Sequence, residues 1–202
     1  MGRPRGDARE KLVKGAFEAL RTLGYGASSS RTIGRIAGIN PALVFYYFES
    51  VDDLLVTALA DSSAARLARY REAMESARST SDLVDTLAEI YRDDVASGHI
   101  TVVSELVAAS ISRPTLAEQI TALMDPWIEL AERAVHAVLR ASPIGEAVAP
   151  RSLARAAVVF YLGANLLACL SPESDEVSAL LDDGARLARL LDELVVGERS
   201  GA

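Results

Sequence analysis

Four aromatic residues in succession, Phe45 to Phe48, constrain the fold more than any other feature of the sequence. They lie in the segment NPALVFYYFESVDD, which runs from Asn40 to Asp53. Side chains in a helix are about 100° apart, so four consecutive rings point in every direction and a surface helix cannot bury them all. The residue types also suit a strand, but a strand needs a pairing partner, and the sequence contains no hairpin signal such as Asn-Gly. We therefore expect a short helix with part of its aromatic surface exposed.

Helix capping signals frame this segment on both sides. Asn40 is a favourable N-cap, and Pro41 suits the first helical position because its missing N–H costs nothing there. Ser50 and Asp53 resemble a further capping box, which opens a long fourth helix. The two start signals leave about two turns for the helix that carries the aromatic run.

Two shorter helices are expected before it. Asp7 and Glu10 resemble a capping box, and apolar residues then recur at helical spacing until Gly24. The turn YGASSSR offers several N-caps for a second helix, which ends at Gly38. A glycine turn between the second and third of three short helices is typical of a helix-turn-helix, which lays its second helix in the DNA major groove.

The remainder of the chain predicts helices separated by short breaks, with the prolines marking helix starts or loops. The stretch HITVVSELVAA could also be extended, because its β-branched residues suit a strand. We expect an all-α fold of about nine helices, those after residue 78 lying near 80–97, 100–111, 115–141, 151–170 and 175–196.

Charge is distributed unevenly along the chain, whose net charge is -7. Residues 1–50 hold eight Lys and Arg against four Asp and Glu, a net +4, and the rest holds 13 against 24, a net -11. A basic head on an acidic body is typical of a DNA-contacting end attached to a solubilising body, although chance unevenness is an alternative. The single cysteine, Cys169, and the lack of an apolar leader indicate a reducing cytoplasm. The sequence has no cluster of Cys and His residues, so neither a bound metal nor a cofactor is predicted.

The segment SSSRTIGRIAGINPALVFYYFESVDDLL resembles the helix-turn-helix of the tetracycline-repressor (TetR) family of bacterial transcriptional regulators. The resemblance covers roughly residues 7 to 55. It implies a helix-turn-helix DNA-binding domain at 7–48, called the head below, and an effector-binding and dimerisation domain at 49–202. It also implies a homodimer that binds a near-palindromic operator and is released by a small effector. The residues that match or conservatively replace the family's frame are Ile33, Ala37, Gly38, Ile39, Val44, Phe48 and Leu54.

The aromatic run then divides into an inner and an outer face. Val44 and Phe48 lie four residues apart and should pack inward, against Leu12, Phe17 and Ile33. The other aromatics are left for DNA, although at most one of the two tyrosines could pack on the fourth helix instead. Two residues depart from the family, which usually has Tyr at 45 and Lys at 51, both of which tend to touch phosphates. The candidate DNA-binding residues are Arg3, Arg5, Ser29, Ser30, Arg31, Asn40, Pro41, Ala42, Leu43, Phe45, Tyr46 and Tyr47.

The first six residues, MGRPRG, are expected to form a flexible basic arm. Gly-Arg-Pro-Arg-Gly resembles the core of an AT-hook, in which proline holds an extended backbone and arginines enter a narrow minor groove. A plain disordered tail is the alternative.

The apolar stretch LARAAVVFYLGANLLACL should be buried on several sides. A membrane span is the rival interpretation, but the uninterrupted part is shorter than the roughly 20 residues that a bilayer requires and contains Asn165. The last helix carries one apolar stripe. In the resembled family the last two long helices pair with their symmetry mates, although an ordinary core would give a similar stripe. The candidate interface residues are Phe160, Ala164, Leu167, Leu180, Leu187 and Leu191.

A small-molecule pocket is expected among helices four to seven, for a hydrophobic or amphipathic effector. Polar and aromatic residues on otherwise aliphatic helices are typical of such sites, although each has an ordinary core or surface role as its alternative. The candidates are Tyr91, His99, Glu105, Met124, Trp127 and His136.

Two other classes of function compete with a regulator. An enzyme is not predicted, because the sequence has two His, one Cys and none of the common catalytic or phosphate-loop motifs. A helical interaction module that has lost DNA binding stays open, because of the departures at Phe45 and Val51.

Overall fold

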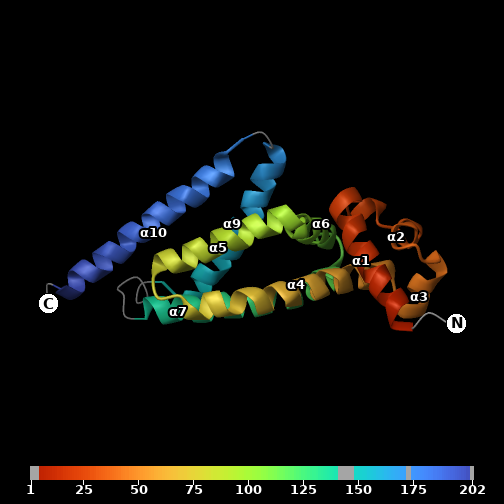
Figure 1. The fold of residues 1–202 in the computed structure, drawn as a ribbon, viewed down its shortest axis with the longest axis horizontal. Coiled ribbons are helices and arrows are strands. Elements are labelled where there is room, and N and C mark those ends of the chain that lie inside the picture. The colour runs from red at the N-terminus through yellow and green to blue at the C-terminus, as the bar shows by residue number, and fades with distance from the viewer. Residues whose placement is uncertain (1–4, 141–147, 172–173, 201–202) are drawn as a thin grey trace. The chain divides into compact units, whose positions relative to one another are not determined.

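The computed structural model describes residues 5–140, 148–171 and 174–200, and these contain helices but no strand (Figure 1). The all-α prediction is therefore confirmed, and HITVVSELVAA is a helix. The α-helices are α1 (Arg5–Leu23), α2 (Ser30–Ala37), α3 (Val44–Tyr47), α4 (Val51–Ser76), α5 (Thr80–Ser97), α6 (His99–Ser110), α7 (Pro114–Leu139), α9 (Pro150–Leu170) and α10 (Glu176–Ser200). Two 3₁₀ turns, η1 (Tyr25–Ala27) and η2 (Pro41–Leu43), precede α2 and α3.

The chain forms two compact units. The N-terminal unit contains Met1–Arg66 and Val95–Leu123, and the C-terminal unit contains Leu67–Asp94 and Met124–Ala202. Their boundaries fall inside α4, α5 and α7. The predicted functional division at residue 48 follows different limits and stays a prediction.

Local capping groups set the helix boundaries of the head. The Ser29 hydroxyl accepts a hydrogen bond from the Thr32 N–H at 3.2 Å and so caps α2. Gly38 ends α2 in the left-handed region, at φ 64°. Asn40 caps the turn before α3 by accepting from the Ala42 N–H at 3.0 Å. These three predicted signals are confirmed, and the first turn of the third helix is 3₁₀ in form.

The fourth helix begins with the expected pair of acceptors in a modified arrangement. The Ser50 hydroxyl accepts from the Asp53 N–H at 3.0 Å, as in a capping box. The Asp53 carboxylate in turn accepts a hydrogen bond from the Glu49 N–H, also at 3.0 Å. In a regular capping box it would accept from the N–H of the next residue, Ser50. The two bonds together turn the chain sharply from α3 into α4.

Two sequence expectations about helix limits were wrong. The first helix begins at Arg5 rather than at Asp7. The Asp7 carboxylate does not mark the start because it pairs with Lys11 at 2.8 Å, one turn into the helix. Pro126 does not mark a start or a loop, because it lies inside α7. Its ring removes one backbone donor, and the helix continues through it to Leu139. Pro143 and Pro172 lie outside the described residues.

The core of the N-terminal unit is built where α1, α2 and α3 meet. Leu12, Ile33 and Val44 are fully buried, and Phe48 is nearly so. The inward packing expected for Val44 and Phe48 is therefore observed. Phe17 is only half-buried, and its ring stacks on the imidazole of His99 in α6, with the ring centres 6.4 Å apart.

In the C-terminal unit, α5 and α10 run antiparallel. Near the end of α5 and the start of α10, Arg92 pairs with Asp182 at 3.9 Å. At the opposite ends, the Asp192 carboxylate accepts hydrogen bonds from the backbone N–H groups of Thr80 and Ser81, at 2.7 and 2.9 Å, and from the Ser81 hydroxyl at 2.6 Å. An acidic residue of the last helix thus caps the first turn of α5 across the unit.

Replacing Asp192 with alanine is expected to destabilise the fold by about 1–2 kcal/mol, because two helix-start N–H groups lose their acceptor. Burial raises the pKa of Asp192, but hydrogen bonds from Ser81 and Thr80 outweigh it and hold the pKa below its ordinary value. Urea unfolding at neutral pH measures the loss. Its matched control is Glu193→Ala, which removes an exposed carboxylate from the next position. Equal effects of the two variants would contradict the capping role.

Candidate nucleic-acid interface

The aromatic run presents two large side chains to solvent. Phe45 is 62% exposed and Tyr46 is 63% exposed, whereas Tyr47 is half-buried with its ring edge against Tyr46, at 4.8 Å between centres. The neighbouring Ala42 is exposed as well. Since Val44 anchors α3 in the core, the helix has one buried side and an apolar, hydroxyl-bearing outer side.

The candidate residues near this surface differ in whether their side chains already act as helix caps. The side chains of Ser29 and Asn40 serve as helix caps. Ser30 lies half-buried at the first position of α2, and Arg31 beside it is exposed. The half-buried residues Pro41 and Leu43 complete η2. Arg3 lies outside the described residues, as does the side chain of Arg5.

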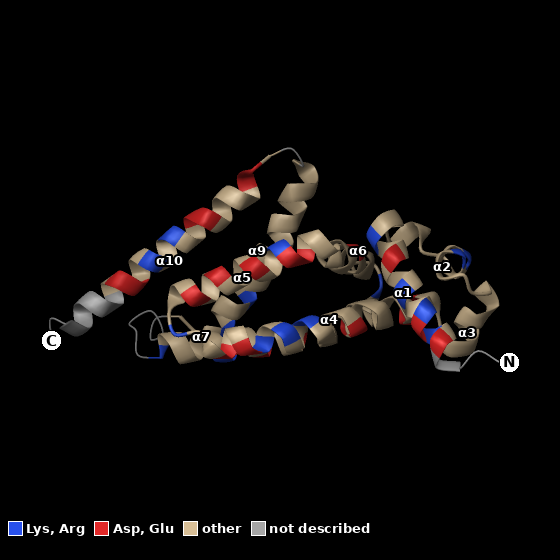
Figure 2. Cartoon of the chain, viewed as in Figure 1, with Lys and Arg blue, Asp and Glu red and all other residues tan. Residues whose placement is uncertain are grey.

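Ion pairs neutralise most cations of α1, on which basic and acidic residues alternate (Figure 2). Lys14 pairs with Glu10 at 2.5 Å, and Arg21 with Glu18 at 2.7 Å, in addition to the pair that holds Lys11. Among the described residues of the head, three exposed arginines have no carboxylate within ion-pairing distance. These are Arg9, Arg31 and Arg35.

Behind this surface, the head is joined to α6 through Tyr25. Its backbone N–H donates to the Glu105 carboxylate at 2.7 Å, and its hydroxyl donates to Asp52 at 2.6 Å. The guanidinium of Arg113 covers its ring at 5.0 Å. Burial, followed by the hydrogen bond to Asp52, raises the pKa of Tyr25 to about 12. Glu105, a candidate pocket residue, therefore serves as an acceptor for the turn that follows α1.

Close backbone approach at two glycines accompanies this junction. Gly24 has φ 76°, and a Cβ there would lie 2.9 Å from the Glu105 carboxylate. Gly98 has φ 74°, and a Cβ there would lie 2.4 Å from the Cδ of Arg21. Both conformations suit glycine and strain other residues. The two glycines therefore occupy both sides of the same contact, one in the head and one at the start of α6.

His99, a second candidate pocket residue, is buried at the same junction. Its Nδ1 lies 2.8 Å from the Ser62 hydroxyl, and its ring stacks on Phe17. Burial, together with the nearby charge of Arg66, lowers the pKa of His99 to about 4. The imidazole is therefore neutral at physiological pH and acts as a packed, hydrogen-bonded core group.

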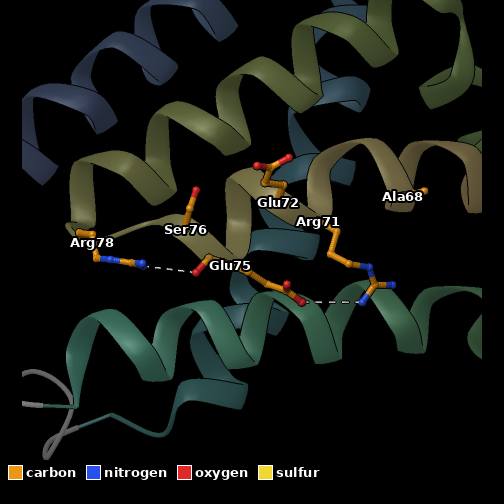
Figure 3. A pocket seen from close by; sticks show the side chains of 6 residues that line it. All are labelled: Ala68, Arg71, Glu72, Glu75, Ser76 and Arg78. Atoms are coloured by element: carbon orange, nitrogen blue, oxygen red, sulfur yellow. Dashed lines mark hydrogen bonds and ion pairs between the residues drawn. The ribbon is translucent and has the colours of Figure 1, made fainter.

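The remaining pocket candidates lie in the C-terminal unit. Tyr91 is buried with its ring edge against Tyr161, 6.1 Å between centres, and Met124 and Trp127 are half-buried. His136 is exposed. A surface hollow of about 350 Å³ also lies in this unit, around the end of α4 (Figure 3). None of the six candidates lines it, because its walls are Ala68, Arg71, Glu72, Glu75, Ser76 and Arg78.

Apolar side chains remain uncovered on the last two long helices. The exposed residues on α9 are Val159, Leu166 and Leu170, and those on α10 are Leu180, Leu187, Leu190 and Leu194. Of the candidate interface residues, Leu180 and Leu187 belong to this exposed face, Phe160, Leu167 and Leu191 are half-buried, and Ala164 is buried within the chain.

The single apolar stripe expected on the last helix is in fact two faces. Val177, Leu181 and Ala188 are buried, whereas the exposed leucines lie on a face about 100° round the helix from them. The sequence pattern shows the two faces as one stripe because they are neighbours on the helix surface. One apolar face of α10 packs within its own unit, and the other is exposed to solvent.

The uninterrupted apolar part of α9 is short, but the whole helix has 21 residues and, by length and composition alone, is long and apolar enough to cross a bilayer. Length therefore does not separate the two interpretations. Only 17% of its apolar window is buried, so the expected burial on several sides is not observed within the chain. Both α9 and α10 therefore expose apolar side chains.

Comparison with known proteins defines the fold. The architecture is similar to that of the transcriptional regulator FadR from Bacillus subtilis in complex with stearoyl-CoA, with a TM-score of 0.76 and 15% identity over 89% of this chain and 96% of that one. It is also similar to a putative TetR-family regulator from Rhodococcus sp., with a TM-score of 0.71 and 19% identity over 90% and 98% of the two chains. The chain has the fold of the TetR-family regulators.

A third structure with the TetR fold, a putative transcriptional regulator from Saccharomonospora viridis in complex with choline, has a TM-score of 0.73 and 16% identity over 89% of this chain and 95% of that one. Among curated sequences, the HTH-type transcriptional regulator UidR of Escherichia coli strain K12 is 23% identical over 109 residues. The chain spans about half the length of this relative, 55%. No protein-family model matches the chain.

Proposed function

We propose that the chain is a ligand-responsive transcriptional repressor that binds a near-palindromic operator as a homodimer. The observation that carries the proposal is the outer side of α3. In a TetR fold α3 is the helix that enters the major groove. It exposes Phe45 and Tyr46, the preceding turn exposes Ala42, and Arg31 of α2 is exposed without an ion pair. Two neighbouring exposed aromatic side chains are typical of an interaction surface.

Each exposed group has a suitable counterpart on duplex DNA. Ala42 and Phe45 are small and flat apolar groups that suit thymine methyls and sugar edges. The Tyr46 hydroxyl can donate to a phosphate while its ring covers the sugar. Arg31, near the start of α2, can bind a phosphate or a guanine edge. Backbone positioning and base readout are therefore both available on one face.

The dimer is supported by the uncovered apolar face of α9 and α10. Leu180, Leu187 and Leu194 recur every seven residues, which is the spacing of a seam between paired helices. A second copy of the same face would bury these leucines in an isologous contact. Two recognition helices would then reach half-sites about one helical turn, or a small multiple of it, apart.

The effector is proposed to be a small hydrophobic or amphipathic molecule, bound near Tyr91, Met124 and Trp127. The structures in complex with stearoyl-CoA and with choline show that proteins of this fold hold small molecules. The effector would release DNA by favouring a spacing of the two heads that the operator cannot match. It has to bind the two states with different affinity, since otherwise it shifts no equilibrium.

Replacing Tyr46 with alanine is expected to weaken operator binding roughly 100-fold, because about 1.4 kcal/mol of contact is lost in each of two heads. Electrophoretic mobility shift with the DNA upstream of the chain's own coding sequence measures the change. The control is Ile111→Ala, which removes an apolar side chain that is 86% exposed and lies outside the head.

Circular dichroism should be unchanged in the tyrosine variant, since Tyr46 is mostly exposed. If the wild-type chain shifts no such fragment, the alternative of a helical interaction module without DNA binding takes precedence. If the wild type binds and both variants bind equally well, the recognition surface has been misplaced.

A further inference from the structure

Arg9 of α1 is held at the end of the recognition helix by an aromatic ring. Its guanidinium carbon lies 5.2 Å from the centre of the Phe48 ring. Phe48 is buried and directly follows α3, so its position is fixed by the core. Arg9 itself is exposed. The contact therefore places a cation at a defined point beside α3, where a long side chain would otherwise sample many rotamers.

The charge of Arg9 is not neutralised by the acidic residues around it. Glu10, the next residue, pairs with Lys14. The Asp53 carboxylate, in the first turn of α4, accepts a hydrogen bond from the Glu49 N–H. No carboxylate of the described residues lies within ion-pairing distance of Arg9, whereas Lys11, Lys14 and Arg21 of the same helix are paired.

The contact with the Phe48 ring leaves the N–H groups of the Arg9 guanidinium available to a partner. The guanidinium carries five N–H donors in one plane, and an aromatic face attracts its charge without providing a carboxylate to accept them. Such a planar, permanently charged fork suits the oxygens of a phosphate. A role in packing alone would not require the cation to be exposed and free of carboxylates.

We propose that Arg9 is a phosphate clamp, which binds the DNA backbone beside the groove that α3 enters. Phe48 links this contact rigidly to the recognition helix, so the phosphate fixes how α3 sits against the bases. The inference rests on the proposed DNA-binding function and adds to it a phosphate contact from Arg9, which is not among the candidate DNA-binding residues.

Replacing Arg9 with glutamine is expected to reduce the slope of log K against log salt by about 0.9 per head, or about 1.8 for a dimer. At 0.1 M salt this corresponds to an affinity loss of about 60-fold. Fluorescence anisotropy with the upstream DNA fragment, measured across a salt series, gives both quantities. Arg9→Lys keeps the charge but loses the planar fork of donors, so it should retain most of the slope at an intermediate affinity.

Lys14→Gln is the matched control, because it removes a cation of the same helix that is already paired. Its slope should equal that of the wild type. An unchanged slope in Arg9→Gln, or an equal fall in Lys14→Gln, would overturn the clamp while leaving the proposed function intact. Weaker binding with an unchanged slope would assign Arg9 a packing role and would overturn it too. Failure of the wild type to bind any upstream fragment would instead sink the proposed function, and the clamp with it.

Discussion

Leu187→Glu is expected to convert the proposed dimer into monomers and to abolish the proposed operator binding. Leu187 is 58% exposed in the single chain and lies at the middle of the uncovered leucines of α10. In an isologous dimer one substitution introduces two carboxylates into one apolar seam, and burying each without a partner costs several kcal/mol. Sedimentation at micromolar concentration measures the association, and mobility shift measures the binding.

The control for this variant is Arg189→Glu, which places a carboxylate two residues further on, about 200° round the helix. Arg189 is exposed, so this variant should remain dimeric. Circular dichroism should match the wild type for both variants, because neither residue belongs to the core of the single chain. A wild type that sediments as a monomer, or a leucine variant that still dimerises, would show that this face has another purpose.

Acidification from pH 6.5 to pH 4 is expected to remove about 3 kcal/mol of stability through His99 alone. Burial lowers the pKa of the folded imidazole from 6.5 to about 4. Between these values the unfolded chain binds more protons than the folded one, so stability rises with pH across this window. Below pH 4 the contribution of His99 has been fully lost.

Urea unfolding of the wild type and of His99→Gln at several pH values isolates this effect. Carboxylates such as Asp192, whose pKa is lowered, also lose stability in acid, but they do so equally in both proteins. Glutamine cannot titrate and can still hydrogen-bond to Ser62. The glutamine variant should therefore show a flatter dependence on pH between 4 and 6.5. Parallel curves would show that His99 does not titrate as its burial implies.

The sequence alone predicted the boundaries that depend on neighbouring residues. Ser29, Gly38 and Asn40 act within three positions of themselves, through hydrogen bonds and backbone angles that their chemistry favours. The inner and outer faces of the aromatic run also followed from residue spacing. The fold class could be predicted for the same reason, since repeated starts and stops leave little room for strands.

The rest depends on contacts between residues far apart in the chain, which have no local signature. Asp192 caps a helix that begins 112 positions earlier. The Tyr25 N–H finds its acceptor 80 positions later, on Glu105. The sequence pattern identified Glu105 and His99 only as polar residues on otherwise apolar helices. The structure shows which groups their side chains contact. Likewise, a periodic stripe cannot tell the buried side of α10 from the open one.

The paired glycines at the junction of the head and α6 limit how such regulators can be recombined. Gly24 follows α1 and Gly98 precedes α6, each with a positive φ, and a Cβ at either position would lie less than 3.0 Å from a side chain of the other segment, Glu105 and Arg21 respectively. A chimera that joins this head to a foreign body, or this body to a foreign head, keeps only one of the two. The segment taken from the other protein then needs a glycine at the corresponding position. Transfer of a new DNA specificity therefore requires a matching substitution in the body in addition to the exchange of the head.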